Sequence, residues 1–335
     1  MAQINKPTDY FNTILTAGGA QSITGVGFQP DLVWNKRRDD TSDHHLNDAV
    51  RGATKLLYPN QTLAEQTNAN FISSFDSDGF TTGSGYWTGG ASIVAWNWLA
   101  SNTTASNTDG SITSTVSANT TSGFSIVSFT GTGSNATVGH GLGAIPKIVI
   151  IKNRDRASGW HVGGDAIGSV NQYLNLNDTN AIDSAGTGFQ SFSSTTFGIG
   201  SDTDWNASGE SIIAYCFSEK KGFSKFGSYT GNGSADGTFV YTGFKPAFVI
   251  LKITNSTNNW HMYDNKRDTY NVADAVLYPN TSGAEGTDTT ADFLSNGFKL
   301  RTSINFANGS GDSYIYMAFA ENPFVTSGGI PTTAR

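Results

Sequence analysis

Short apolar runs rich in Val, Ile, Phe, Tyr and Trp alternate along the chain with stretches of Gly, Ser, Thr, Asn and Asp. Such runs, bounded by turn residues, are typical of β-strands, whereas a helix would place apolar residues every three or four positions over a longer stretch. Residues 148–151 and 248–251 are apolar at every position. This pattern predicts central strands of a sandwich that are covered on both faces. A helical turn is expected only near residues 48–51.

The apolar runs recur three times in the same order, so the chain contains an internal repeat. In each copy a proline opens an apolar strand and a lysine follows six residues later: Pro30 and Lys36, Pro146 and Lys152, Pro246 and Lys252. A histidine follows each lysine by nine residues and is itself preceded by a ring: His44 and His45, Trp160 and His161, Trp260 and His261. Agreement at these distances predicts three diverged units of about 100 residues.

The spacing of these marks sets the expected domain organisation. The three prolines lie 116 and then 100 residues apart, and the extra length falls in a Ser/Thr/Asn-rich run whose only large apolar residues are Ile112 and Val116. We therefore expect the following division: repeat 1 at residues 1–100, a linker or extended connecting arm at 101–122, repeat 2 at 123–222, and repeat 3 with a C-terminal tail at 223–335. The short join after residue 220 predicts that repeats 2 and 3 pack closely and that repeat 1 is held more loosely.

Composition agrees with an all-β fold of three tandem, jelly-roll-like β-sandwich repeats. Of the 335 residues, 37% are hydrophobic and 12% are aromatic, which is enough to fill real cores, while 39 are glycine and only 14% are charged. This balance favours short strands joined by many turns over long helices. The single cysteine, Cys216, excludes an internal disulfide and is expected to be a buried free thiol.

Charge and hydropathy argue against two kinds of partner. A net charge of −7 disfavours duplex nucleic acid, because phosphate neutralisation needs clustered cations and the one dense cluster, at residues 36–38, runs into two aspartates. No apolar stretch approaches the roughly 18 residues that a membrane span requires, and residues 1–10 lack the apolar segment of a signal peptide. We expect the chain to fold in the cytoplasm, with neither nucleic acid nor membrane as a partner.

The repeated histidines are the first candidates for chemistry. Repeats 1 and 3 share a His-x-x-Asp-x-x-Arg register, with His45, Asp48 and Arg51 in one copy and His261, Asp264 and Arg267 in the other. Repeat 2 keeps His161 but has Gly164 and Ile167 at the other two positions. A metal site needs further ligands at matching places, so no metal or cofactor is expected. We favour a structural role in which the Asp–Arg pair fixes a loop, and the alternative is a ligand-binding surface.

Aromatic residues among Asn, Asp and Gly would suit stacking on sugar rings, and the candidates are Tyr86, Trp87, Trp160 and Trp260. Aromatics that recur at one register of a repeat usually belong to the core, which is the favoured interpretation here. Catalysis has little support, because no G-x-S-x-G elbow occurs and Glu65 and Glu285 occupy equivalent positions of two separate units. No catalytic residue is assigned, and the protein is expected not to be an enzyme.

Four strings of the sequence are specific enough to indicate a family. They are GFQPDLVW at 27–34, NTDGSITSTVSAN at 107–119, GSYTGNG at 227–233 and YMAFAENPF at 316–324. They resemble a repeated β-rich domain of virion proteins from tailed phages that infect marine bacteria, cyanobacteria included. The resemblance covers nearly the whole chain. It implies a structural protein of the virion and brings no catalytic residue with it.

The expected function follows from this resemblance. It is that of a structural protein on the surface of a tailed-phage virion, assembled in the host cytoplasm and in contact with other tail or capsid proteins. A tail-associated or fibre-like protein would bind a host receptor or surface glycan. A head decoration or cement protein is the alternative, and a free carbohydrate-binding module is a third. A homo-oligomer is compatible with all three.

Overall fold

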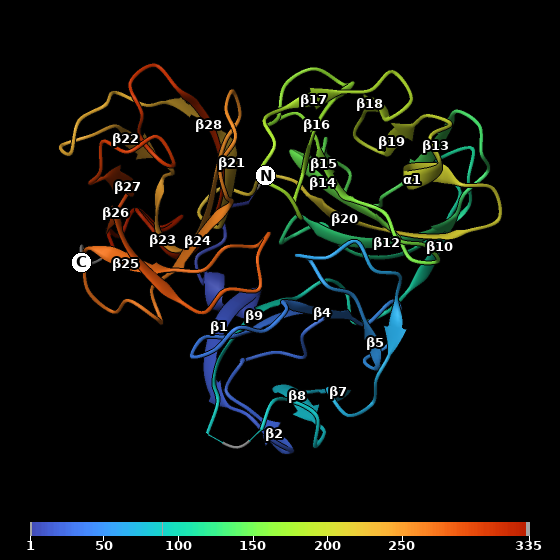
Figure 1. Cartoon of the computed structure of the whole chain (residues 1–335), viewed down its shortest axis with the longest axis horizontal. Helices are drawn as coiled ribbons and strands as arrows, with labels where there is room; N and C mark the ends of the chain where they lie inside the picture. Colours follow the sequence, from blue (N-terminus) through green and yellow to red (C-terminus); the bar gives the residue numbers. More distant parts are fainter. Residues whose placement is uncertain (1, 89, 333–335) are drawn as a thin grey trace.

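The computed structural model describes residues 2–88 and 90–332, which form three lobes around a common centre (Figure 1). Each lobe is one repeat, built as a sandwich of an inner and an outer antiparallel sheet. The expected all-β fold is confirmed, since 45% of the residues are in strands and 2% are in helices. Short runs of β-branched and aromatic residues fit pleated strands, and the frequent turns leave no long helical stretch.

Repeat 1 is the lobe drawn in blue to teal in Figure 1. It begins with a 3-10 helix, η1 (Pro7–Asp9). Its inner sheet, in spatial order, consists of β1 (Phe11–Ala17), β9 (Ser92–Trp98), β3 (Leu32–Arg37) and β4 (His45–Asp48). Its outer sheet consists of β2 (Gln21–Ile23), β8 (Gly79–Thr82) and β7 (Ile72–Asp76). A short ladder pairs β5 (Lys55–Leu56) with β6 (Gln66–Thr67). Residues 49–51 form a turn after β4 and no helix.

Repeat 2 has the widest inner sheet, with eight strands. In spatial order they are β10 (Ala105–Asn107), β11 (Ser114–Asn119), β12 (Phe124–Thr130), β20 (Ser211–Phe217), β14 (Ile148–Asn153), β15 (Trp160–Gly163), β16 (Gln172–Asn175) and β17 (Asp183–Ser184). The outer sheet consists of β13 (Ala136–Gly139), β19 (Thr196–Ile199) and β18 (Phe189–Phe192). Within the described residues the single α-helix is α1 (Thr203–Asn206), whose first turn is capped by the Asp202 carboxylate.

Repeat 3 has four strands in each sheet. The inner sheet consists of β21 (Ser224–Thr230), β28 (Ser313–Pro323), β23 (Phe244–Ile253) and β24 (His261–Asp264). The outer sheet consists of β22 (Phe239–Tyr241), β27 (Gly297–Leu300), β26 (Gly286–Leu294) and β25 (Ala273–Val276). The pairing of β23 with β28 shifts register around Pro246, because proline has no N–H to donate to the ladder.

The central strands β9, β20 and β28 are buried on both faces. In β20, Ile212, Ala214 and Cys216 pack against the outer sheet of repeat 2, while the alternate side chains point to the centre of the molecule. β9 and β28 divide their side chains in the same way. Each inner sheet therefore serves two cores, one inside its own sandwich and one common to all repeats, and this explains runs that are apolar at every position. The expected buried free thiol of Cys216 is confirmed.

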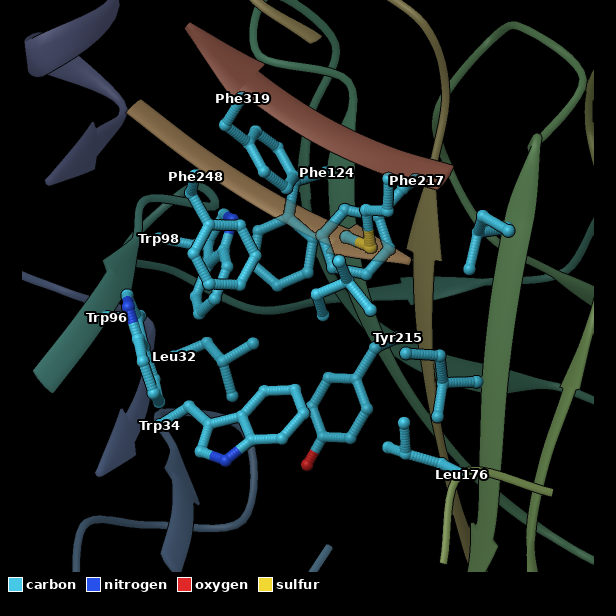
Figure 2. Packing of buried hydrophobic residues seen from close by; sticks show 14 of the residues in the cluster. Leu32, Trp34, Trp96, Trp98, Phe124, Leu176, Tyr215, Phe217, Phe248 and Phe319 are labelled. Carbon is cyan, nitrogen blue, oxygen red and sulfur yellow. The ribbon is translucent and has the colours of Figure 1, made fainter. Parts of the chain in front are cut away.

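The common core is filled by large side chains from all three repeats (Figure 2). Those labelled in Figure 2 are Leu32, Trp34, Trp96 and Trp98 of repeat 1, Phe124, Leu176, Tyr215 and Phe217 of repeat 2, and Phe248 and Phe319 of repeat 3. Ring pairs cross the repeat boundaries, with Phe11 stacked on Phe319 at 5.1 Å and Trp96 5.7 Å from Phe248. Two small apolar voids of about 20 Å³ each lie beside these rings.

Repeat 1 contributes to the common core as fully as the other two, so it is not the loosely held unit that we expected. Its Trp96 ring N–H donates to Asp264 of repeat 3 over 3.0 Å, and its Asp48 accepts from the Tyr215 hydroxyl of repeat 2 over 2.7 Å. The length of a join in the sequence therefore does not decide how tightly two repeats pack.

Residues 101–122, expected to be a linker or connecting arm, are not a free linker. They contain β10 and β11, and β11 pairs with β12 along five residues of each strand. Ile112 and Val116 anchor the segment in the sandwich core of repeat 2, where both are buried. Thr113 and Thr115 between them are exposed and fit a strand with one polar face, while β10 forms the edge of the sheet. The segment thus extends the inner sheet of repeat 2.

Equivalent hydrogen bonds join the repeats in a ring. The ring side chain before each repeated histidine contacts a backbone carbonyl of another repeat: Trp160 donates to Tyr58 (2.9 Å), Trp260 donates to Asn175 (2.9 Å), and His44 Nε2 lies 3.1 Å from the Tyr278 carbonyl. Because His44 Nδ1 accepts from Trp34 Nε1 at 2.9 Å, the imidazole proton is on Nε2 and is donated to Tyr278. The third contact joins repeat 1 to repeat 3 and closes the ring.

A buried charge network lies at the boundary of repeats 1 and 2. The fully buried Arg51 guanidinium donates to Asp48 over 2.5 Å and to Glu65 over 3.1 Å. Glu65 also accepts from Arg154 of repeat 2 over 2.8 Å, and Asp48 accepts the Tyr215 hydroxyl described above. The Asp–Arg pair expected from the sequence is therefore present, and it fastens a neighbouring repeat as well as its own loop.

The same network recurs at the boundary of repeats 3 and 1 and is replaced at the third boundary. Its members there are Asp264, Arg267 and Glu285 of repeat 3 with Arg38 and Trp96 of repeat 1. At the boundary of repeats 2 and 3, the equivalent residues are Gly164, Ile167, Ile182, Thr254 and Met317. A buried charge that loses its partner is costly, whereas an all-apolar replacement can be neutral. The network is accordingly complete at two boundaries and replaced in all five positions at the third.

We predict that Arg51→Ile, which introduces the residue found at Ile167, lowers the free energy of unfolding by about 3–5 kcal/mol, because Asp48 is left buried without its cation. Adding Asp48→Gly should restore part of this loss, so the double variant should be more stable than Arg51→Ile alone. Urea unfolding at pH 7 measures both differences.

The control is Arg37→Ile, which removes a partly exposed ion pair with Asp39 and should cost no more than about 1 kcal/mol. Equal losses for Arg51→Ile and Arg37→Ile would contradict the proposed role of the network.

Candidate functional site

The three repeated histidines each lie flat on an aromatic ring inside their own repeat. The stacked pairs are His45 on Trp87 at 4.6 Å, His161 on Trp205 at 4.2 Å, and His261 on Phe306 at 4.5 Å. A tyrosine edge contacts each imidazole, from Tyr58, Tyr173 and Tyr278 respectively. All three histidines are buried, so they do not form the ligand-binding surface that was the alternative interpretation.

Burial also keeps the imidazoles of His45 and His261 neutral. It lowers the pKa of His45 to about 3 and that of His261 to about 4, so neither carries charge at pH 7. Nδ1 of His45 and both ring nitrogens of His161 make no hydrogen bond within the described residues. The nearest carboxylate oxygen to His161 Nε2 is that of Asp204, at 3.7 Å. Each imidazole lies flat on an aromatic ring and acts here as a packing group.

The candidate aromatics are packing residues as well. Trp160 and Trp260 lie in the common core, where their ring N–H groups bind another repeat. Tyr86 is buried and donates to the Asn35 side chain over 2.7 Å, and burial raises the pKa of its hydroxyl. Trp87 is partly exposed, and its ring N–H donates to Ser42 over 3.1 Å. Only His45, Tyr86 and Trp87 of the candidates are brought together.

The lysines that mark the repeats proved to be buried, which sequence reasoning missed. Lys36, Lys152 and Lys252 have no exposed surface, and burial lowers the pKa of each to about 8. Their ammonium groups donate to backbone carbonyls, and two of these bonds cross to the preceding repeat, to Thr62 at 3.2 Å and to Thr179 at 3.1 Å. Lys152 and Lys252 therefore fasten neighbouring repeats, whereas Lys36 donates to carbonyls of its own repeat, those of Arg37 and Asp40.

Within residues 2–88 and 90–332, no three His, Cys, Asp or Glu side chains gather closely enough to share a metal ion. No helix in this part of the chain has the length and apolarity needed to cross a bilayer. Burial raises the pKa of the Cys216 thiol, which disfavours the reactive thiolate.

A surface groove of about 900 Å³ lies between repeats 2 and 3, and we call it the 2–3 groove. Lysines line it, together with apolar side chains that are exposed to solvent. The lysines are Lys147, Lys220, Lys221 and Lys225, and the exposed apolar residues are Ile145, Tyr241 and Phe324. The sequence signal was the density of lysines around residue 221 in a chain that is only 14% charged.

The 2–3 groove carries positive charge on an acidic protein. Lys147 pairs with Asp165 outside the lining, and Lys225 pairs over 3.2 Å with Glu219, the one carboxylate among the described lining residues. Lys221 is exposed and forms no salt bridge with any residue that the structure describes. Burial lowers the pKa of Lys220. The groove therefore offers ammonium groups and aromatic surface to a ligand that approaches from solvent.

We predict that the protein loses stability as the pH falls from about 6.5 to 4. The pKa values of His44, His45, His140 and His261 are lowered by burial, so in this window the unfolded chain binds more protons than the folded chain. Asp31, whose pKa burial raises to about 6, and Asp268, whose pKa burial also raises, oppose the trend with two groups against four.

Differential scanning calorimetry at pH 7 and pH 4.5 measures the effect as a lower Tm in acid. His261→Gln should show a smaller difference between the two pH values. An equal or higher Tm at pH 4.5 for the unmodified protein would contradict the assignment of neutral, buried imidazoles.

Comparison with known proteins places the chain in one family. A family model described as "Domain of unknown function (DUF7483)" matches residues 6–323. This range includes the strands of all three repeats and residues 101–122. A search of curated proteins finds no match. Because the family model covers most of the chain, the protein belongs to the family described as Domain of unknown function (DUF7483).

Proposed function

We propose that the protein is a non-catalytic structural component on the surface of a tailed-phage virion, located on the tail, where it contacts other virion proteins and a host receptor. The observation that carries this proposal is the resemblance of four strings, spread from residue 27 to residue 324, to the repeated β-rich domain of such virion proteins. The proposal extends to the whole chain, because the three repeats share one core.

The structural roles of the repeated polar and aromatic residues support this proposal. The repeated histidines, lysines and tryptophans fasten or fill the body. Rigid β-rich bodies with adhesive surfaces suit a particle whose parts must hold together outside the cell, and loops or grooves on such a scaffold provide specificity. The 2–3 groove is the surface feature of this kind, and it favours a tail location in contact with the host.

A head decoration protein is the second candidate. The three-lobed shape of the body, without an extended shaft in the described residues (Figure 1), would equally suit a cement protein seated on a capsid lattice. The two locations differ in copy number, since decoration follows the capsid lattice and a tail component does not.

Quantitative mass spectrometry of purified virions tests the proposal by counting this chain against the major capsid protein. A small fraction of the capsid protein is expected for a tail component. A ratio near one, or a simple fraction of it, would assign the chain to the head instead. Absence of the chain from intact virions would overturn both locations.

A further inference from the structure

The strand registers align the three repeats. The lysines and Tyr241 of the 2–3 groove can therefore be compared with the residues at the aligned positions of the other two repeats. None of the four groove lysines has a cation at the aligned positions of the other repeats. The aligned pairs are Asp31 and Ala247 for Lys147, Ser101 and Asn322 for Lys220, Asn102 and Pro323 for Lys221, and Asn12 and Ser125 for Lys225. At each of these positions the other two repeats adopt the same fold without a lysine. Packing requirements therefore do not explain the four groove lysines.

The aromatic side of the groove shows the same contrast. Tyr241, which is 57% exposed, aligns with Thr24 and Gly139, because Val240, Val138 and Ile23 pair with equivalent phenylalanines of the outer sheets. A small residue therefore satisfies the fold at this position. Phe324 adds a second ring on the same groove and is 36% exposed. Clustered aromatic surface that packing does not require is typical of a binding site.

We propose that the 2–3 groove binds an acidic polysaccharide. Sugar rings stack on Tyr241 and Phe324, and the carboxylate or sulfate groups of the polymer bind the ammonium groups of Lys147, Lys221 and Lys225. The volume of about 900 Å³ lies within the range of small-ligand sites. The binding itself is a property of the isolated chain. The further step, that such a polysaccharide is the host receptor, rests on the proposed function.

The charge distribution favours an acidic glycan over nucleic acid. Among the described residues that line the groove, every cation is a lysine, although arginine is the usual residue for bidentate phosphate recognition. The chain as a whole has a net charge of −7, which repels a polyphosphate backbone outside the groove. A glycan has more widely spaced charges and apolar ring faces, so a few lysines beside two aromatic rings complement it better.

Isothermal titration calorimetry on the purified full chain tests this inference. The probes are oligogalacturonate, which carries carboxylates, dextran sulfate, which carries sulfates, and neutral dextran. We expect binding to at least one acidic probe and not to dextran, and weaker binding at high salt, because exposed charges are screened. The difference between the acidic probes identifies the preferred anion.

Variants that introduce the residues of repeat 1 are matched to the fold. Lys221→Asn and Tyr241→Thr should each weaken binding about ten-fold and leave the Tm unchanged. The controls are Lys266→Asn and Tyr270→Thr, which alter an exposed lysine and a tyrosine that is 82% exposed, both outside the groove lining. These controls should bind like the unmodified protein.

Three results would overturn the inference: no binding of either acidic probe, binding that the groove variants leave intact, or tighter binding of single-stranded oligothymidylate than of both acidic probes. The proposed function fails separately. A chain that binds glycan but is missing from virions refutes the virion location alone, and a chain that is present in virions but binds no acidic glycan refutes the groove assignment alone.

Discussion

Burial of both faces of β9, β20 and β28 is the constraint on which the rest of the structure depends. Each of these strands gives alternate side chains to its own sandwich and to the common core, so no repeat can leave without exposing rings such as Trp96, Tyr215 or Phe319. Fully burying one large apolar side chain is worth about 1.5–3 kcal/mol, while a whole domain is stable by only about 5–15 kcal/mol. Exposure of one face of the common core would therefore remove most of the stability, and the three repeats form a single body.

Within this constraint the repeats differ in ways that show what each position must do. The common core keeps large apolar residues in all three copies, and the buried lysines Lys36, Lys152 and Lys252 are kept as well. The boundary network is either complete or replaced in all five positions, as expected if a half-satisfied set of buried charges costs more than either alternative. At the surface, where packing imposes little, the 2–3 groove combines lysines with exposed aromatic rings. Features that the three repeats share thus hold the molecule together. The 2–3 groove, whose lysines and tyrosine are not repeated, is the candidate recognition site.

The strands and the repeat could be predicted because their signals are local. Alternation and turn residues identify strands, and the proline-to-lysine spacing aligned the copies. A run such as residues 248–251 also showed that both faces of a strand are covered. The sequence pattern does not say what covers the second face. In the structure that face packs against the other two repeats. Residues 101–122 were misjudged because only Ile112 and Val116 signal their burial. The 2–3 groove could not be predicted, since it joins turns of two repeats that only the folded chain brings together.

The most direct test of a shared core is the cooperativity of unfolding, measured by differential scanning calorimetry of the full chain at pH 7. One body with one common core should unfold in a single transition whose calorimetric and van't Hoff enthalpies agree. Separate transitions for the repeats, or a van't Hoff enthalpy that far exceeds or falls far below the calorimetric value, would contradict it, and a value near one third of the calorimetric enthalpy would mean that the three repeats unfold independently.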